Sequence, residues 1–96
     1  MKKLEIIANH SIEEDLFELL KNRNVGKRYT KVPVVHGAGD SEPKQGDHIW
    51  PEENFLLVIY CEEAEAEAVR DALRELKSYF PQEGIKLFEL DAEQTV

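Results

Sequence analysis

The stretch FLLVIYC, residues 55–61, is the longest apolar run in the chain and decides its fold. Its length is typical of a strand and falls far short of a membrane helix. Successive side chains of a strand point to opposite faces of the sheet, so a run that is apolar at every position predicts burial on both faces. We therefore expect residues 55–61 to form a central strand whose two faces are both covered.

The segments around this run predict two helices and three further strands. Ser11 and Glu14 form a capping-box pattern that predicts the start of the first helix, which ends before Gly26. Apolar residues at helical spacing predict a second helix over 64–80, which Pro81 stops. The remaining segments predict strands at residues 4–8, 29–35 and 85–90, followed by a polar tail at 91–96.

The order βαββαβ predicts an α+β, ferredoxin-like fold, with a four-stranded antiparallel sheet and both helices on one face. The first and third strands are central in this topology, and the second lies at an edge. Pro33 supports the edge position, because a proline cannot donate a hydrogen bond to a neighbouring strand. Since the helices cover only one face, the second apolar face of residues 55–61 predicts packing against other copies of the chain.

The composition limits the class of protein. A length of 96 residues predicts one domain, spanning 1–96. The net charge of −8 argues against binding to nucleic acid or to anionic membranes, which require Lys and Arg. Cys61 is the only cysteine, which excludes a disulfide within the chain and predicts a cytoplasmic location. The sequence shows neither a signal-peptide pattern nor a membrane-spanning apolar segment.

A long polar connection between the second and third strands, residues 37–54, carries most of the candidate functional residues. A loop of this length in a small domain is usually functional or disordered. Gly37 and Gly39 either allow backbone amides to approach an anion or simply turn the chain. Trp50 either packs on the sheet or stacks on a partner. Lys86, on the last strand, either contacts a phosphate or lies exposed.

Two histidines give the loop a second, metal-binding interpretation. His36 and His48 offer imidazole nitrogens, the commonest protein ligands of transition metals. Asp40 or Asp47 would add a carboxylate, although the spacing matches no zinc signature. Ser41 lies near both histidines, but no third group orients a triad. We therefore expect no enzyme activity, and the sequence identifies no cofactor.

The chain resembles the PII signalling superfamily in its opening MKKLEII (1–7), in its βαββαβ order and in VVHGAG (34–39) leading into a long loop. The VVHGAG segment resembles the Gly-x-Gly motif at the root of that family's T-loop. The stretch YTKVPVVHGAGDSEPKQGDHIWPEEN (29–54) looks most like a divergent PII-like branch. The resemblance implies a homotrimer with inward-facing sheets, small effectors bound in clefts between subunits, and a loop that contacts a protein target.

The resemblance implies that the chain is a trimeric regulatory module. The alternative is a divalent-metal-binding protein similar to the cation-tolerance proteins. The alternative would use His36, His48 and the acidic residues of the loop. In the nitrogen regulators a Gly-rich segment before the last strand holds ATP, whereas residues 81–86 here read PQEGIK. This difference argues against ATP and 2-oxoglutarate as effectors of the usual kind. The candidate ligand-binding residues are His36, Gly37, Gly39, His48, Trp50 and Lys86.

Overall fold

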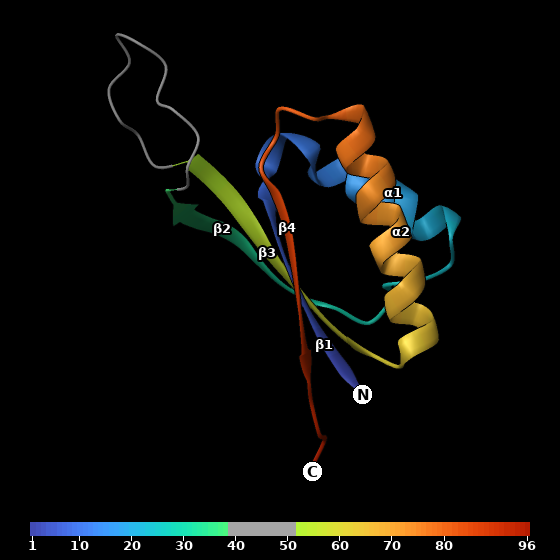
Figure 1. The fold of residues 1–96 in the computed structure, drawn as a ribbon. Coiled ribbons are helices and arrows are strands. Elements are labelled where there is room, and N and C mark those ends of the chain that lie inside the picture. Colours follow the sequence, from blue (N-terminus) through green and yellow to red (C-terminus); the bar gives the residue numbers. More distant parts are fainter. Residues whose placement is uncertain (39–51) are drawn as a thin grey trace, which may run out of the picture.

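The computed structural model describes residues 1–38 and 52–96, which form a sheet with two helices on one face (Figure 1). The elements follow the predicted order, with a short 3-10 helix added before the first α-helix. They are β1 (Lys2–Asn9), η1 (His10–Ile12), α1 (Glu13–Asn22), β2 (Thr30–Gly37), β3 (Glu52–Cys61), α2 (Glu63–Tyr79) and β4 (Ile85–Asp91). The predicted ferredoxin-like fold is confirmed.

Within the described residues the sheet has four strands in the order β2-β3-β1-β4, and each neighbouring pair is antiparallel. β3, which contains the 55–61 run, is central, and β2 lies at an edge, as predicted. The register between β2 and β3 shifts between Val32 and Val35, where Pro33 lies. This bulge accommodates a residue that has no N–H to donate to β3.

The pairing of β2 with β3 extends further than the sequence indicated. The predicted loop began at Gly37 and ended at Asn54, yet Gly37 pairs with Glu52, and Asn54 pairs with Val35. These predicted boundaries were wrong, because backbone hydrogen bonds continue the ladder even where the side chains are polar. The rest of the predicted loop, residues 39–51, lies outside the described residues.

The core lies between the helices and one face of the sheet. Its largest fully buried side chains are Leu4, Ile6, Phe55, Leu57 and Ile59 from the strands and Ile12, Leu16, Leu20, Val69 and Leu76 from the helical segments. Full burial of each is worth about 1.5–3 kcal/mol. Cys61 is buried beside them, and this burial, together with the charge of Glu65, raises the pKa of its thiol. No helix in the described part of the chain is long and apolar enough to cross a membrane.

The opposite face of the sheet, called here the open face, carries large apolar side chains that no helix covers. Leu56, Val58 and Tyr60 of β3 alternate with its buried residues and therefore lie on this face. Phe88 and Leu90 of β4 extend it, and the fractional exposures of Tyr60, Phe88 and Leu90 are 51%, 50% and 47%. The apolar second face that the sequence predicted is therefore present and only partly buried in one chain.

The first helix begins differently from the prediction. The side-chain oxygen of Asn9 accepts a hydrogen bond of 2.9 Å from the backbone N–H of Ser11, and α1 has no side-chain cap of its own. The predicted capping box of Ser11 and Glu14 was wrong. Because Ser11 lies inside the 3-10 turn, its N–H is a donor to be capped, and Asn9 supplies the acceptor.

Gly26 follows the first helix, as predicted, and closes the link between α1 and β2 in the left-handed conformation, with φ of 69°. A Cβ at this position would lie 3.2 Å from Leu20 Cδ1, closer than almost all side chains approach. The N–H of Gly26 donates to Glu65 Oε2 on α2 at 2.9 Å. Glycine is therefore favoured here by the backbone angle, and an added Cβ would also require the Leu20 side chain to shift slightly.

Candidate functional site

The root of the loop lies at one end of the sheet, where β2 ends and β3 begins (Figure 1). His36 pairs with Glu53 and Gly37 with Glu52 across these strands, and both His36 and Gly37 are exposed. These two predicted site residues are therefore adjacent and accessible. The remaining loop candidates, which lie outside the described residues, are Gly39, Asp40, Ser41, Asp47, His48 and Trp50.

Gly37 is not required to be glycine by the fold of this chain. Its φ lies outside the left-handed region, and a Cβ built on it would lie 3.6 Å from Asn54 Nδ2, an ordinary contact. This contrasts with Gly26, where the positive φ strains any other residue and an added Cβ would make a tighter contact. A requirement for glycine at position 37 would therefore come from a group outside the described fold, such as a ligand or a neighbouring subunit.

Lys86 and His36 lie on opposite faces of the sheet. Lys86 pairs with Ile7, which lies between two buried residues of β1 and so points to the open face. His36 pairs with Glu53, which shares the helix-covered side of β3 with Phe55. Paired residues of antiparallel strands point to the same face. The described fold therefore brings His36 and Gly37 together but does not bring Lys86 to them.

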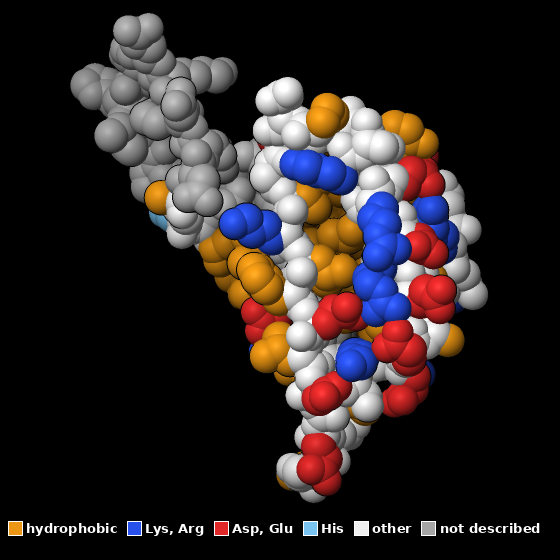
Figure 2. All heavy atoms as spheres, viewed as in Figure 1, with side chains coloured by type: hydrophobic (Ala, Val, Ile, Leu, Met, Phe, Trp, Pro, Cys, Tyr) orange, Lys and Arg blue, Asp and Glu red, His pale blue; other side chains and the backbone are white. Residues whose placement is uncertain are grey.

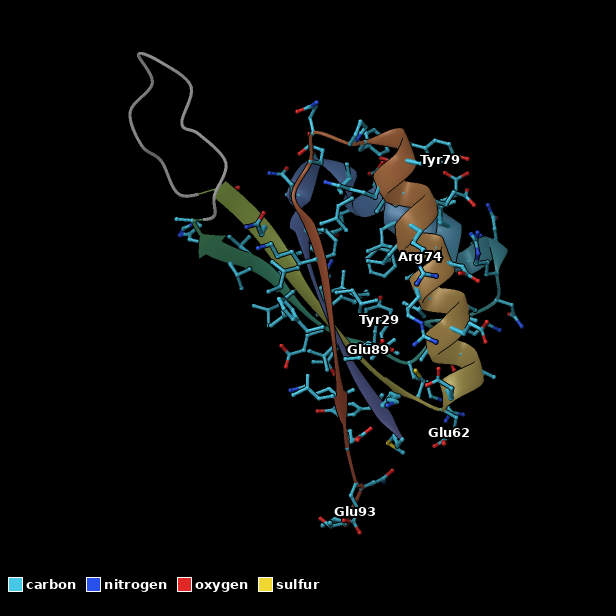
Figure 3. All side chains as sticks on the ribbon, in the orientation of Figure 1. Tyr29, Glu62, Arg74, Tyr79, Glu89 and Glu93 are labelled. Carbon is cyan, nitrogen blue, oxygen red and sulfur yellow. The ribbon has the colours of Figure 1, made fainter. Side chains whose placement is uncertain are left out.

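A cavity of about 540 Å³ lies at the other end of the sheet, away from the root of the loop. Its walls come from the segment before β2, from the open face of β3 and from both ends of the chain. The lining residues are Met1, Arg28, Tyr29, Thr30, Val58, Tyr60, Ala92, Glu93 and Gln94. Figure 3 shows Glu93 near the C-terminal end of the chain, at the opposite end of the sheet from the end of β2 and the start of β3. The volume falls within the range of ligand pockets, about 300–1,000 Å³.

The cavity is lined by one cationic side chain, Arg28, and one carboxylate, Glu93, so it can hold an anionic group beside Arg28 and a flat ring against Tyr60. Arg28 offers a guanidinium, which can bind a phosphate or carboxylate with two hydrogen bonds. Tyr60 presents an aromatic ring, and Thr30 a hydroxyl, on the open face beside it. The ring of Tyr29 is 5.2 Å from that of Phe17, between centroids, which anchors the segment against α1.

This cavity was not predicted from the sequence. The run Lys27-Arg28-Tyr29-Thr30 places two adjacent cations beside an aromatic ring and a hydroxyl in an acidic chain, and that clustering was the available signal. Nothing in the sequence indicated that Arg28 would lie beside Tyr60 and Glu93, which are distant along the chain. Their proximity follows from the strand register, which pairs Thr30 with Val58.

The described residues contain no metal centre. Within residues 1–38 and 52–96, no group of three or more His, Cys, Asp or Glu side chains is placed to hold a metal ion. His10 Nδ1 lies 3.3 Å from Glu13 Oε1, and Lys31 Nζ donates to Glu13 Oε2 at 2.9 Å. This cluster joins the start of α1 to β2 and contains only two potential metal ligands.

A four-stranded antiparallel sheet, two helices on one face and a long connection between β2 and β3 define the chain as a ferredoxin-like α+β protein. The model of the family "Nitrogen regulatory protein P-II" matches residues 1–96, and the chain belongs to this family. This family consists of regulatory proteins, and the chain is therefore a regulatory signalling module of the PII type. None of the curated proteins matched the chain.

Solved structures with the same fold include two PII-like proteins. CPII from Thiomonas intermedia K12, solved with ADP and bicarbonate bound, has 24% sequence identity and a TM-score of 0.68, covering 93% of this chain and 82% of that one. A putative PII-like signalling protein from Thermus thermophilus has 26% identity and a TM-score of 0.64, covering 93% of this chain and 83% of that one. A further CPII structure contains ADP, AMP and bicarbonate, with 22% identity, a TM-score of 0.62, and coverage of 99% and 94%.

Proposed function

We propose that the chain, as one domain over residues 1–96, is a trimeric PII-type regulatory module. It binds a small anionic effector between its subunits and contacts a protein target through the loop rooted at His36 and Gly37. The observation that carries this proposal is the open face, which is apolar across β3 and β4 and half-exposed in a single chain. Packing of copies on this face would bury those side chains and would close the cavity beside them.

The chemistry of the cavity supports an adenine nucleotide with bicarbonate as the first effectors to test. Arg28 would bind the phosphates or the bicarbonate, and the ring of Tyr60 would stack on the base. CPII, which shares this fold, is a nucleotide- and bicarbonate-bound relative of the family. In this proposal Gly37 and Gly39 of one subunit border the cleft that holds the cavity of a neighbouring subunit, and Lys86 is a further cation on the open face.

The remaining loop residues would report the bound effector to the target. His48 and Trp50 belong to this proposed arm, together with His36 at its root. Membership of the P-II family favours this regulatory function over the metal-binding alternative, because a regulatory role in this family requires no metal site in the loop. The loop would then serve protein recognition, and its histidines would contact the target or an effector held in the cavity of a neighbouring subunit.

The proposal is tested by isothermal titration of the purified chain with ADP, with and without bicarbonate. We expect saturable binding that is weakened about 10- to 100-fold in Arg28→Ala, since a hydrogen bond to a charged group contributes about 1.5–3 kcal/mol. Arg74→Ala is the matched control, because Arg74 is an exposed arginine on α2 outside the cavity. Unchanged affinity in Arg28→Ala, or no binding of ADP or AMP by the wild type, would contradict the proposed site.

A further inference from the structure

A second groove lies between α2 and β4, on the helix side of the sheet and apart from the proposed effector site. Its volume is about 310 Å³. The lining residues are Arg70, Leu73, Arg74, Lys77, Ile85, Leu87 and Glu89. Figure 2 shows this hollow as an apolar floor between the backbone of β4 and a column of Lys and Arg side chains on α2.

The floor of the groove is apolar because α2 leaves part of the edge strand uncovered. Leu73 is almost fully buried, whereas Ile85 and Leu87 of β4 are only partly buried against the core. The two residues alternate along β4, so both side chains point toward α2. An apolar side chain from outside could therefore rest on Ile85 and Leu87 and complete their burial.

The rim of the groove is cationic, although the chain as a whole is strongly acidic. Arg70 is held between Glu63, at 2.6 Å, and Glu89, and so forms a fixed wall. Arg74 is 72% exposed, and its one ion pair with a residue that the structure describes is with Asp71, itself exposed. Such exposed pairs contribute little and exchange readily.

Lys77 completes the rim, with its ammonium group directed at a backbone carbonyl. Its Nζ donates to the carbonyl oxygen of Glu83 at 2.7 Å. In the described part of the chain it lies in no ion pair with a carboxylate. Its positive charge, with that of Arg74 one turn earlier on α2, is thus available to an anionic partner.

The same edge of β4 also offers unpaired backbone groups. β4 is the last strand of the sheet, with β1 as its only neighbour among the described strands. The backbone N–H of Asn9 donates to the carbonyl of Gly84, and that of Ala92 donates to the carbonyl of Met1. The backbone N–H and C=O groups of the even-numbered residues in this segment therefore point toward β1. The backbone groups of the odd-numbered residues, 85, 87 and 89, therefore point outward. Those are the β4 residues whose side chains line the groove.

From the apolar floor, the cationic rim and the open strand edge, we propose that this groove binds an extended acidic segment of a partner protein. The segment would pair its backbone with the free edge of β4, as in other cases of strand addition. Side chains two residues apart in a strand share a face, so one apolar residue would lie over Leu87 and Ile85. An acidic residue two positions further would reach Arg74 or Lys77.

The experiment uses fluorescence anisotropy with a fluorescein-labelled heptapeptide of sequence Ser-Leu-Thr-Glu-Thr-Glu-Ser and the full-length chain. We expect saturable binding that weakens at least about 10-fold when both glutamates of the peptide are replaced by glutamine. The double variant Arg74→Glu and Lys77→Glu should abolish binding, and Arg74→Glu alone should weaken it. A matched double variant, Lys21→Glu and Lys27→Glu, makes the same change of charge away from the groove and should bind as the wild type does.

Three results would overturn the proposal. The first is equal affinity for the glutamate and glutamine peptides, which would show that the groove does not recognise the negative charges of the peptide. The second is equal affinity of the wild type and of Arg74→Glu, with both proteins shown by circular dichroism to be folded. The third is a change of oligomeric state in Arg74→Glu, which would indicate that another copy of the chain covers the groove. ADP titration of the same variants keeps this test separate from that of the effector site.

Discussion

Phe88 on the open face offers a sharp test of assembly through this face. Its ring is 50% exposed in a single chain. Full burial of such a side chain is worth about 1.5–3 kcal/mol, so the half that remains exposed represents about 1 kcal/mol per copy. In a trimer with three equivalent copies, Phe88→Ala should therefore cost about 3 kcal/mol of association free energy. That corresponds to roughly a hundred-fold or more in the association constant.

Sedimentation equilibrium at concentrations from well below to well above the wild-type dissociation midpoint would measure this effect. Tyr79→Ala is the matched control, because Tyr79 is an aromatic residue of comparable exposure, 63%, on α2 (Figure 3). The control should leave association unchanged. A wild-type chain that remains monomeric at micromolar concentration, or equal association of wild type and Phe88→Ala, would refute the assignment of the open face as a subunit interface.

Three further predictions follow from the described contacts. Gly26→Ala should lower the free energy of unfolding by about 1–2 kcal/mol in urea denaturation, because an L residue is strained at its positive φ, whereas Gly84→Ala should change it by less than about 1 kcal/mol. The Arg23 guanidinium holds the pKa of Glu75 below its usual value, so its contribution to stability is present above the unfolded pKa, near 4.3, and is lost as pH falls through the lower folded value. Between pH 5 and 3 the melting temperature of the wild type should therefore fall more steeply than that of Arg23→Met, and parallel curves would contradict this. Cys61, whose thiol pKa is raised by burial, should react with a disulfide reagent slowly in the native protein and fully in guanidinium chloride.

The fold could be predicted because its main determinants are local. The apolar run of residues 55–61 required a strand covered on both faces, and Pro33 required an edge position. The strand positions hold in the structure, where β3 is central and β2 lies at the edge. The start of α1 was not predictable in the same way, because Ser11 and Asn9 are both good caps and the choice depends on the 3-10 turn between them.

The arrangement of the candidate site depended on non-local geometry that the sequence does not contain. Without the bulge at Pro33, the strand register would place His36 on the open face with Lys86. The extra residue in β2 shifts the alternation by one and moves His36 to the other face. The sequence pattern does not show whether a bulge at Pro33 shifts the strand register by one residue. The cavity lined by Arg28 and Tyr60 was missed for the same reason, since it forms only when distant strands pair in one register.

The most direct test of the central claim is the fluorescence of Trp50 during effector binding. Trp50 is the only tryptophan in the chain and lies in the loop that we propose reports the effector to a target. Titration with ADP and bicarbonate should change its emission with the same saturation curve that calorimetry gives, and Arg28→Ala should shift both curves together. Binding measured by calorimetry without any change in Trp50 emission would contradict the claim that this loop responds to the effector.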